Sequence, residues 1–286
     1  MKSMKIGLTF LSAILVLWSS ACSRPHTVEP IEAGTATPTL FISAPDTATP
    51  TRLPEVTRVS VEDQYTAVEE AILILAPGAG SRLLSPLRVS GFADPTFEQH
   101  LLIQLVLVDG NQLAAAATII QAEAGKRGPF SAEVPFEIQD ERQAFILVSA
   151  DSPRDGGITH LASVGVTLAA GGTEEIKNVE PHPEQIVILQ PTQGMVVSGG
   201  QARVKGFALA SFEQTLVVEV LDEAGNMIGT LPVVVQAPDW GQPGPFSAEV
   251  PYTIAAPGAG RIVVRDPSVV FEGNVHLASV EIWLKP

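Results

Sequence analysis

The chain contains two copies of one sequence module. Residues 128–135 (GPFSAEVP) recur without change at 244–251, and residues 160–164 (HLASV) recur at 276–280. Upstream, Gly-Phe-Ala at 91–93 and Phe-Glu-Gln at 97–99 return at 206–208 and 212–214. Four landmarks in one order, at a shift of 115 or 116 positions, far exceed chance for a period this long. A duplicated domain therefore constrains the fold more than any other feature.

The repeats divide the chain into five segments. Each copy has about the 100 residues typical of a β-sandwich, and such a length can bury its own core. The expected segments are a signal peptide (1–21), a stalk (22–70), a first domain (71–168), a linker (169–185) and a second domain (186–286). The linker is expected to mix flexible glycine-containing and stiff proline-containing elements.

Charge and cysteine content exclude several classes of protein. The 286 residues include 17 Lys and Arg against 31 Asp and Glu, a formal charge of −14 with histidine neutral. This balance argues against a nucleic-acid partner, because phosphates need a basic surface. Cys22 is the only cysteine, so no disulfide can form within the chain. The domains must therefore be stable through packing alone.

Residues 1–21 have the pattern of a secretory signal peptide. Two lysines precede the apolar run 6–18, which is too short for a comfortable membrane span, and small residues follow up to Cys22. The pattern resembles the bacterial lipobox, although Ser19 stands where leucine is usual. We therefore expect lipidation at Cys22 and attachment to the bacterial membrane through this lipid. The alternative is an incidental thiol beside a conventional cleavage site.

The segment 22–70 is rich in Thr and Pro, as in Thr35–Pro38 and Thr47–Thr51. Repeated proline removes backbone donors, and the segment offers little apolar material for a core. We expect a disordered stalk that holds the domains away from the membrane. O-glycosylation of this stalk is left open by the composition.

Short β-rich runs separated by turn residues indicate an all-β fold of two tandem antiparallel β-sandwiches. In the second copy the predicted strands are 186–190, 203–208, 215–221, 227–236, 245–252, 261–265 and 275–284. In the last of these, Ala278, Val280, Ile282 and Leu284 share one face. Residues 101–108 are almost continuously apolar, as expected of a central strand covered on both sides.

The order of motifs resembles the immunoglobulin-like domain of bacterial spore-germination proteins, the Gmad-type domain. Both copies open with Ile-x-Ile-x-x-Pro, continue with Gly-Phe-Ala and Phe-Glu, and end with a Gly-x-Phe strand and a closing apolar strand. Trp240–Gly241 also fits the family, whereas the first copy has Gly125–Arg127 there. The resemblance implies a non-catalytic extracytoplasmic accessory or adhesion-like domain. The germination-type or peptidoglycan-related domains that often accompany it are not found in this sequence, which weakens a role in spores.

Several side chains recur at equivalent positions and are predicted to be structural. Each phenylalanine of Phe-Glu is expected to anchor a loop while its glutamate satisfies loop amides, the alternative being a carboxylate that binds a cation or a cationic sugar. The two histidines could be metal ligands, but no His or Cys lies at ligand spacing, so hydrogen bonding is preferred and no metal or cofactor is predicted. These residues are Phe97, Glu98, Phe130 and His160, with Phe212, Glu213, Phe246 and His276 as their counterparts.

Catalytic patterns are missing from the sequence. It contains no Gly-x-Ser-x-Gly, no phosphate-binding glycine loop and no His-Glu-x-x-His. The run Asp151–Asp155 could offer oxygen ligands to Ca²⁺ but lacks the spacing of a calcium loop. The pairs Glu69–Glu70 and Glu174–Glu175 are expected to be solvated in polar linkers. We therefore predict that the protein is not an enzyme.

Trp240 and Trp283 are the candidate binding surface, because tryptophan on a loop or an outward strand face is costly unless something covers it. The alternative is that Trp240 covers one end of its sandwich and Trp283 packs on the linker or the first domain.

These observations predict a non-catalytic, extracytoplasmic lipoprotein that binds or scaffolds at the cell envelope. Its partner would be an envelope protein or a cell-wall polysaccharide. The alternatives are a purely structural spacer and an accessory subunit of an envelope complex related to germination. A hydrolase has the least support, and the sequence specifies neither the ligand nor the oligomeric state.

Overall fold

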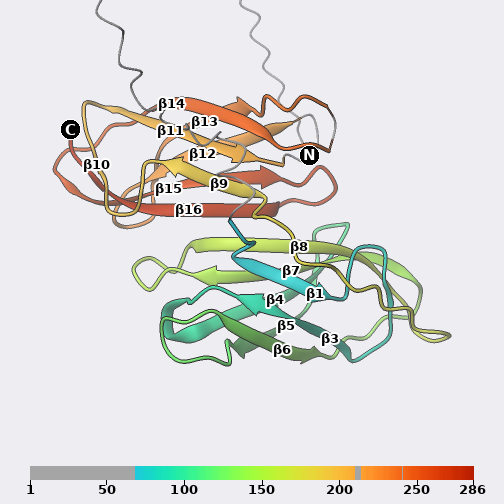
Figure 1. Cartoon of the computed structure of the whole chain (residues 1–286). Coiled ribbons are helices and arrows are strands. Elements are labelled where there is room, and N and C mark those ends of the chain that lie inside the picture. The colour runs from blue at the N-terminus through green and yellow to red at the C-terminus, as the bar shows by residue number, and fades with distance from the viewer. Residues whose placement is uncertain (1–67, 210–213, 240) are drawn as a thin grey trace, which may run out of the picture. The chain divides into compact units, whose positions relative to one another are not determined.

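The computed structural model describes residues 68–209, 214–239 and 241–286, and strands are nearly the only regular secondary structure in these ranges (Figure 1). The first copy contains β1 (Ile72–Ala76), β2 (Arg82–Leu83), β3 (Leu87–Ala93), β4 (His100–Leu107), β5 (Gln112–Ile119), β6 (Gly128–Val134), β7 (Arg142–Asp151) and β8 (Ile158–Leu168), with a short 3₁₀ helix (Phe97–Gln99) before β4. The second contains β9 (Ile186–Gln190), β10 (Val196–Val197), β11 (Gln201–Ala208), β12 (Thr215–Leu221), β13 (Met227–Val234), β14 (Gly244–Pro251), β15 (Gly258–Pro267) and β16 (Asn274–Leu284).

The predicted all-β fold is confirmed, and each predicted strand of the second copy corresponds to an observed strand. The two-residue strands β2 and β10 were not predicted. Within the described ranges, no helix has the length and apolar character needed to span a bilayer.

Each copy is a sandwich of two antiparallel sheets with the same topology. In the first copy, the sheet β1-β3-β6 faces the sheet β5-β4-β7-β8, and β2 joins the latter by pairing in parallel with β8. In the second copy, β9-β11-β14 faces β13-β12-β15-β16, and β10 pairs in parallel with β16. Repetition of topology down to these short edge strands shows that the sequence duplication is a structural one.

Each sandwich encloses its own apolar core. The predicted inward face of β16 is confirmed, since Ala278, Val280, Ile282 and Leu284 are all buried. Phe130 on β6 and Phe246 on β14 lie in the two cores.

The Gly-Phe-Ala and Gly-x-Phe landmarks are explained by one packing contact. A Cβ atom on Gly91 would lie 2.0 Å from the carbonyl oxygen of Leu73 and 2.9 Å from the Phe130 ring. On Gly206 it would lie 2.2 Å from the carbonyl oxygen of Val187 and 2.5 Å from the Phe246 ring. Only glycine lets these phenylalanines fill the space beneath the neighbouring strand.

Residues 169–185, expected to be a linker, run along the first sandwich with regular hydrogen bonds. The Gly78 amide donates to the Lys177 carbonyl (2.6 Å), and the Val179 amide donates to the Leu75 carbonyl (2.8 Å). Arg82 and Glu175 exchange a pair of backbone hydrogen bonds of 2.8 Å each. The linker thus adds a short strand-like segment to the edge formed by β2.

The two sandwiches meet through their last strands. β8 and β16 pair antiparallel, with Leu161 opposite Leu277 and His160 opposite Ala278. The outer faces of the two larger sheets enclose a third apolar cluster, made of Val106, Leu147, Leu161, Val263, Phe271 and Leu277. The second face of β4 is therefore covered in part by the other copy, as Val106 shows.

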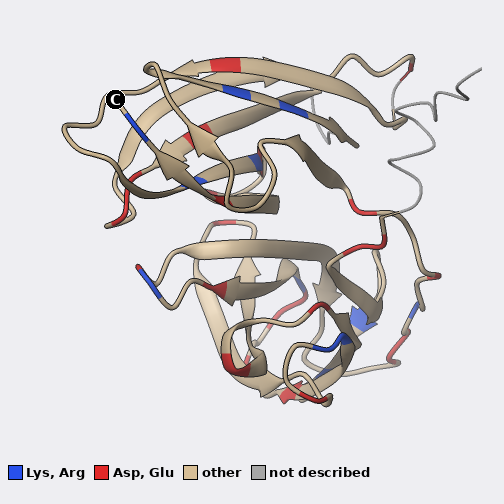
Figure 2. Ribbon diagram, turned by 60° about the vertical axis from the view of Figure 1, so that its left-hand side comes forward, with Lys and Arg blue, Asp and Glu red and all other residues tan. Residues whose placement is uncertain are grey.

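Charged residues of both signs are interspersed over the described ribbon (Figure 2).

Candidate functional site

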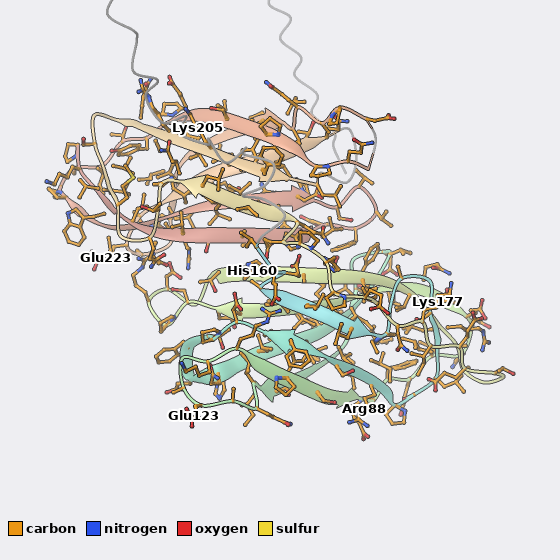
Figure 3. All side chains as sticks on the ribbon, in the orientation of Figure 1. Arg88, Glu123, His160, Lys177, Lys205 and Glu223 are labelled. Atoms are coloured by element: carbon orange, nitrogen blue, oxygen red, sulfur yellow. The ribbon has the colours of Figure 1, made fainter. Side chains whose placement is uncertain are left out.

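Four ionisable side chains meet where the two sandwiches join. His160 lies on β8 and His276 on β16, while Glu70 and Glu184 stand just before β1 and β9 (His160 is labelled in Figure 3). One imidazole nitrogen or carboxylate oxygen from each residue can be chosen so that all four atoms lie within 4.8 Å of one another. We call these four residues the tetrad. Each copy contributes one glutamate and one histidine, and each residue has its counterpart in the other copy.

The tetrad has close contacts between unlike groups. His276 Nε2 lies 2.7 Å from Glu184 Oε1, which is a hydrogen bond. The other three separations are longer: His160 Nε2 lies 3.4 Å from Glu184 Oε2 and 3.6 Å from Glu70 Oε1, and His276 Nε2 lies 3.7 Å from Glu70 Oε1. The two imidazole rings stand edge to face, with centroids 5.3 Å apart.

Backbone amides hold both carboxylates in a reciprocal arrangement. The Ala71 amide donates to Glu184 Oε2 (2.8 Å), and the Gln185 amide donates to Glu70 Oε2 (3.1 Å). Glu184 therefore accepts a hydrogen bond from the residue after Glu70, and Glu70 accepts one from the residue after Glu184. With Leu161 opposite Leu277 in the strand pairing, this exchange defines a pseudo-twofold axis through the interface.

Burial and neighbouring charges shift the pKa values of Glu184 and His276. Burial raises the pKa of Glu184, but the charge of His160 and the hydrogen bond and charge of His276 outweigh it and lower the pKa to about 2. Burial lowers the pKa of His276, but the charge of Glu70 and the contact with Glu184 raise it above its ordinary value. Glu70 Oε1 and His160 Nε2 are buried without a hydrogen-bond partner.

A second polar cluster lies beside the tetrad in the same interface. Arg261 on β15 is fully buried, and its Nη2 donates to both carboxylate oxygens of Asp155 at 2.7 and 2.8 Å. The Gly157 amide also donates to Asp155 (2.9 Å), and Glu281 lies 3.6 Å from Arg261 Nη1. Burial raises the pKa of Asp155, but the Gly157 amide and the Arg261 guanidinium lower it to about 2.

These contacts test the sequence predictions for charged residues. The expectation that Glu70 is solvated is wrong, because its side chain is 1 % exposed. The run Asp151–Asp155 does not form a calcium loop, because the Asp155 carboxylate is occupied by Arg261 and Gly157. Hydrogen bonding by His276 is observed, yet both histidines also have acidic companions that the sequence search overlooked.

The predicted aromatic sites have mixed outcomes. Trp283 is 45 % exposed on the outer face of β16, beside the half-exposed Met195 and Val196. The prediction that Phe97 anchors its loop by burial is wrong, because the residue is 56 % exposed, and Glu98 is exposed as well. The remaining predicted positions, Cys22, Trp240, Phe212 and Glu213, lie outside the described residues.

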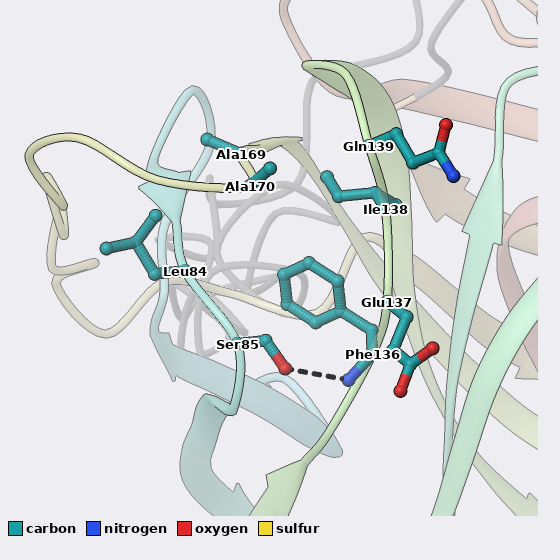
Figure 4. A pocket seen from close by; sticks show the side chains of 8 residues that line it. All are labelled: Leu84, Ser85, Phe136, Glu137, Ile138, Gln139, Ala169 and Ala170. Carbon is teal, nitrogen blue, oxygen red and sulfur yellow. Dashed lines mark hydrogen bonds between the residues drawn. The ribbon is translucent and has the colours of Figure 1, made fainter.

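Figure 4 shows a hollow in the first sandwich, lined by the segments that follow β2, β6 and β8. It has a volume of about 610 Å³ and is lined mainly by small and apolar residues, among them Leu84, Phe136 and Ala169. The Phe136 amide donates to the Ser85 hydroxyl across it (3.0 Å). Glu137 is the one ionisable residue of this lining, so the hollow lacks the paired groups that general acid–base chemistry requires.

The repeated module matches a known family at both of its copies. Residues 71–157 and 185–270 match the Gmad2 family, described as the immunoglobulin-like domain of bacterial spore germination. The chain belongs to this family. The resemblance noted in the sequence is therefore confirmed for both copies. Gmad2 is not a known enzyme family. No curated protein matches the chain.

Two solved structures with distant similarity illustrate how this Gmad2 chain compares with known folds. A crystal structure of red sea bream transglutaminase has a TM-score of 0.27 and 9 % identity, over 82 % of this chain and 34 % of that one. Dimeric latent PorU from Porphyromonas gingivalis has a TM-score of 0.24 and 12 % identity, over 76 % of this chain and 24 % of that one. The chain spans about a third and a quarter of these two proteins, and similarity this low carries no argument about activity.

Proposed function

We propose that this Gmad2 protein is a non-catalytic lipoprotein of the bacterial cell envelope whose second domain binds an extended segment of a partner protein. Lipid attachment at Cys22 is part of the proposal and is supported by the charged, apolar and small residues of the leader. Membership of a family of immunoglobulin-like domains that is not a known enzyme family supports a binding role rather than hydrolysis.

The observation that carries the proposal is a difference between the edges of the two domains. In the first domain, Arg82 of β2 exchanges two backbone hydrogen bonds with Glu175 of the linker. Val196 of β10 occupies the equivalent place in the second domain, and it is half exposed. Among the described residues, no segment pairs with the outer side of Val196. An open edge of this kind is a template for a further strand.

Side chains beside this edge favour a partner. Met195, Val196 and Trp283 are each about half exposed, and Val196 lies opposite Trp283 in the strand pairing. The Trp283 amide donates to the Met195 carbonyl (2.9 Å), so the three residues form one patch. Tryptophan and methionine are enriched in protein interfaces, and a strand added to β10 would lie beside them. We call this surface the β10 edge.

Site-specific photocrosslinking in the bacterium that makes the protein tests this proposal. A photoreactive amino acid at position 196 of the full chain should give a discrete crosslinked protein, and Trp283→Ala should abolish that product. The same amino acid at Val234, an exposed position on β13, is the matched control and should give none. Retention of the full chain on purified peptidoglycan through Trp283 would replace the protein partner with a polysaccharide. If neither is found, the spacer is the better description.

The anchor is tested separately from the binding role. Metabolic labelling with a clickable palmitate should mark the wild-type chain and leave Cys22→Ser unlabelled. Label retained on the variant, or none on the wild type, would remove the lipoprotein from the proposal without affecting the β10 edge.

A further inference from the structure

We propose that the tetrad of Glu70, His160, Glu184 and His276 binds one divalent transition-metal ion, Zn²⁺ by preference, which clamps the two Gmad2 domains together. Imidazole nitrogens and carboxylate oxygens are both ligands of zinc. The site differs from the β10 edge in position and in role, so it stands independently of the proposed binding function.

The spacing of the ligand atoms fits a tetrahedral ion. Zinc bonds of about 2.0–2.1 Å with tetrahedral angles place neighbouring ligand atoms about 3.3 Å apart. With Glu184 Oε2 and Glu70 Oε1 as the ligand oxygens, three His–Glu separations, at 3.4, 3.6 and 3.7 Å, are close to that edge length. The same three are too long for hydrogen bonds. The 2.7 Å hydrogen bond of His276 Nε2 ends on the other carboxylate oxygen, Glu184 Oε1, and would be replaced when this nitrogen coordinates an ion.

Unpartnered atoms point to the same conclusion. Glu70 Oε1 and His160 Nε2 are buried and have no hydrogen-bond partner. A buried polar atom without a partner destabilises the fold, and the tetrad contains a third one, His276 Nδ1. Coordination to a single ion would satisfy Glu70 Oε1 and His160 Nε2.

A divalent ion would also balance the charge of the tetrad. Glu70 and Glu184 are both buried, and two buried carboxylates need positive charge beside them. An imidazolium can supply that charge, and one divalent ion with two neutral imidazoles would supply it equally and leave the tetrad neutral. The reciprocal amide bonds from Ala71 and Gln185 already fix the carboxylates, as outer-shell partners do in metal sites.

Four protein ligands make this a closed, structural type of site rather than a catalytic one. An ion can still reach it from the surface. His160 lines a hollow of about 440 Å³ between the domains, together with Phe97 and Glu281. Glu70 lines a smaller one of about 170 Å³ with His182 and Gln185. Because each domain supplies one His and one Glu, a bound ion would link residues far apart in the sequence.

Zinc binding to the full chain tests the proposal. The purified chain is stripped with chelator and titrated with Zn²⁺ by calorimetry, and bound metal is counted by mass spectrometry. We expect one ion per chain and a higher Tm, which chelator reverses. His160→Gln and Glu184→Gln should each weaken binding by at least about 10–100-fold, the loss that even an outer-shell partner causes.

His182→Gln is the matched control. His182 Nδ1 lies 3.9 Å from Glu70 Oε2, but the side chain is 37 % exposed and is not one of the four ligands. This variant should bind zinc as the wild type does. Should a tetrad variant fail to fold, Co²⁺ in the wild type gives an independent result, since four-coordinate cobalt has intense visible absorption bands.

Two results would overturn the site. One is a wild type that takes up no zinc, or takes up Co²⁺ with only the weak bands of an octahedral ion. The other is zinc binding that is unchanged in His160→Gln and Glu184→Gln while both remain folded. Either result would leave the tetrad as a metal-free network of ion pairs.

Discussion

At the scale of single residues, Gly91 and Gly206 are fixed by space rather than by backbone conformation. Gly206→Ala would place a Cβ atom 2.2 Å from the Val187 carbonyl oxygen and 2.5 Å from the Phe246 ring, so strand and core must both shift. We expect the free energy of unfolding to fall by about 1–3 kcal/mol, the usual cost of overpacking. Urea denaturation measures this change. Gly171→Ala, with no atom within 4 Å, should change it by less than about 0.5 kcal/mol, and equal effects would refute the explanation.

Asp155 gives the interface an acid-sensitive contact. Its pKa is lowered from an ordinary value of 3.8 to about 2, so its contribution to stability is complete above about pH 4. The contribution is lost as the pH falls through about 2, because the folded state must then take up a proton that the unfolded state binds more readily. We expect this loss to be about 2 kcal/mol.

Chemical denaturation at several pH values tests that prediction. The difference in free energy of unfolding between the wild type and Asp155→Asn isolates the residue, because Glu184 and other carboxylates titrate in both proteins. The difference should shrink between pH 4 and pH 2. A difference that does not depend on pH would show that Asp155 does not titrate as described.

The tetrad shows what sequence reasoning missed at this scale. His160 and His276 stand out because they recur, but no His or Cys lies at short ligand spacing from either of them. Glu70 and Glu184 lie about 90 residues from the histidines of their own copies, and only the sandwich brings them together. A usable signal existed, since both glutamates stand two residues before the opening Ile-x-Ile.

At the scale of elements, the long strands were predictable and the short edges were not. Alternation of apolar residues specifies β16 and β14 because one face is buried in the core. A two-residue strand such as β2 or β10 has no period to detect, and its pairing depends on β8 or β16 elsewhere in the sequence. The sequence pattern also did not predict the interface between the domains. Leu277 was the available hint, because it is an apolar, buried residue on the outward face of an alternating strand.

The contact between β15 and the β7–β8 loop makes a strong energetic prediction. Asp155→Leu leaves the buried Arg261 guanidinium without its nearest negative charge. Arg261→Met leaves the Asp155 carboxylate buried without the guanidinium. Each single variant should lose about 3–5 kcal/mol of unfolding free energy. The double variant should lose less than the sum, and less than Asp155→Leu alone, because it removes both charges. Denaturation of all four proteins gives the coupling energy, and additive losses would contradict a direct pair.

At the scale of the whole described unit, the two domains are related by a pseudo-twofold axis, like the two subunits of a dimer. This symmetry is broken at one pair of contacts. With a shift of 116, Asp155 is equivalent to Phe271 and Arg261 to Phe145. One side of the axis therefore has the Asp155–Arg261 ion pair. The other side has Phe145 and Phe271 in contact, with ring centroids 4.8 Å apart. The tetrad and the Leu161–Leu277 pair, by contrast, are the same from either side.

This asymmetry determines which domains can pair. In a pair of two first domains about the same axis, Asp155 of each copy would face Phe145 of the other. In a pair of two second domains, Arg261 of each copy would face Phe271 of the other. Both leave buried charges without partners, which costs several kcal/mol each. Only a first domain paired with a second domain brings Asp155 to Arg261 and Phe145 to Phe271. The contact thus favours association of the first domain with the second over association of like domains.

Cutting the chain at an engineered protease site near Pro181 tests this preference. After denaturation and refolding together, native mass spectrometry should show first-with-second complexes in large excess over pairs of like domains. In the variant carrying both Asp155→Phe and Arg261→Phe, phenylalanine occupies all four positions, and like pairs no longer bury Asp155 or Arg261 without an opposite charge. Like pairs should then become abundant. An unchanged distribution would mean that the shared tetrad and leucines, rather than the broken symmetry, decide which domains associate.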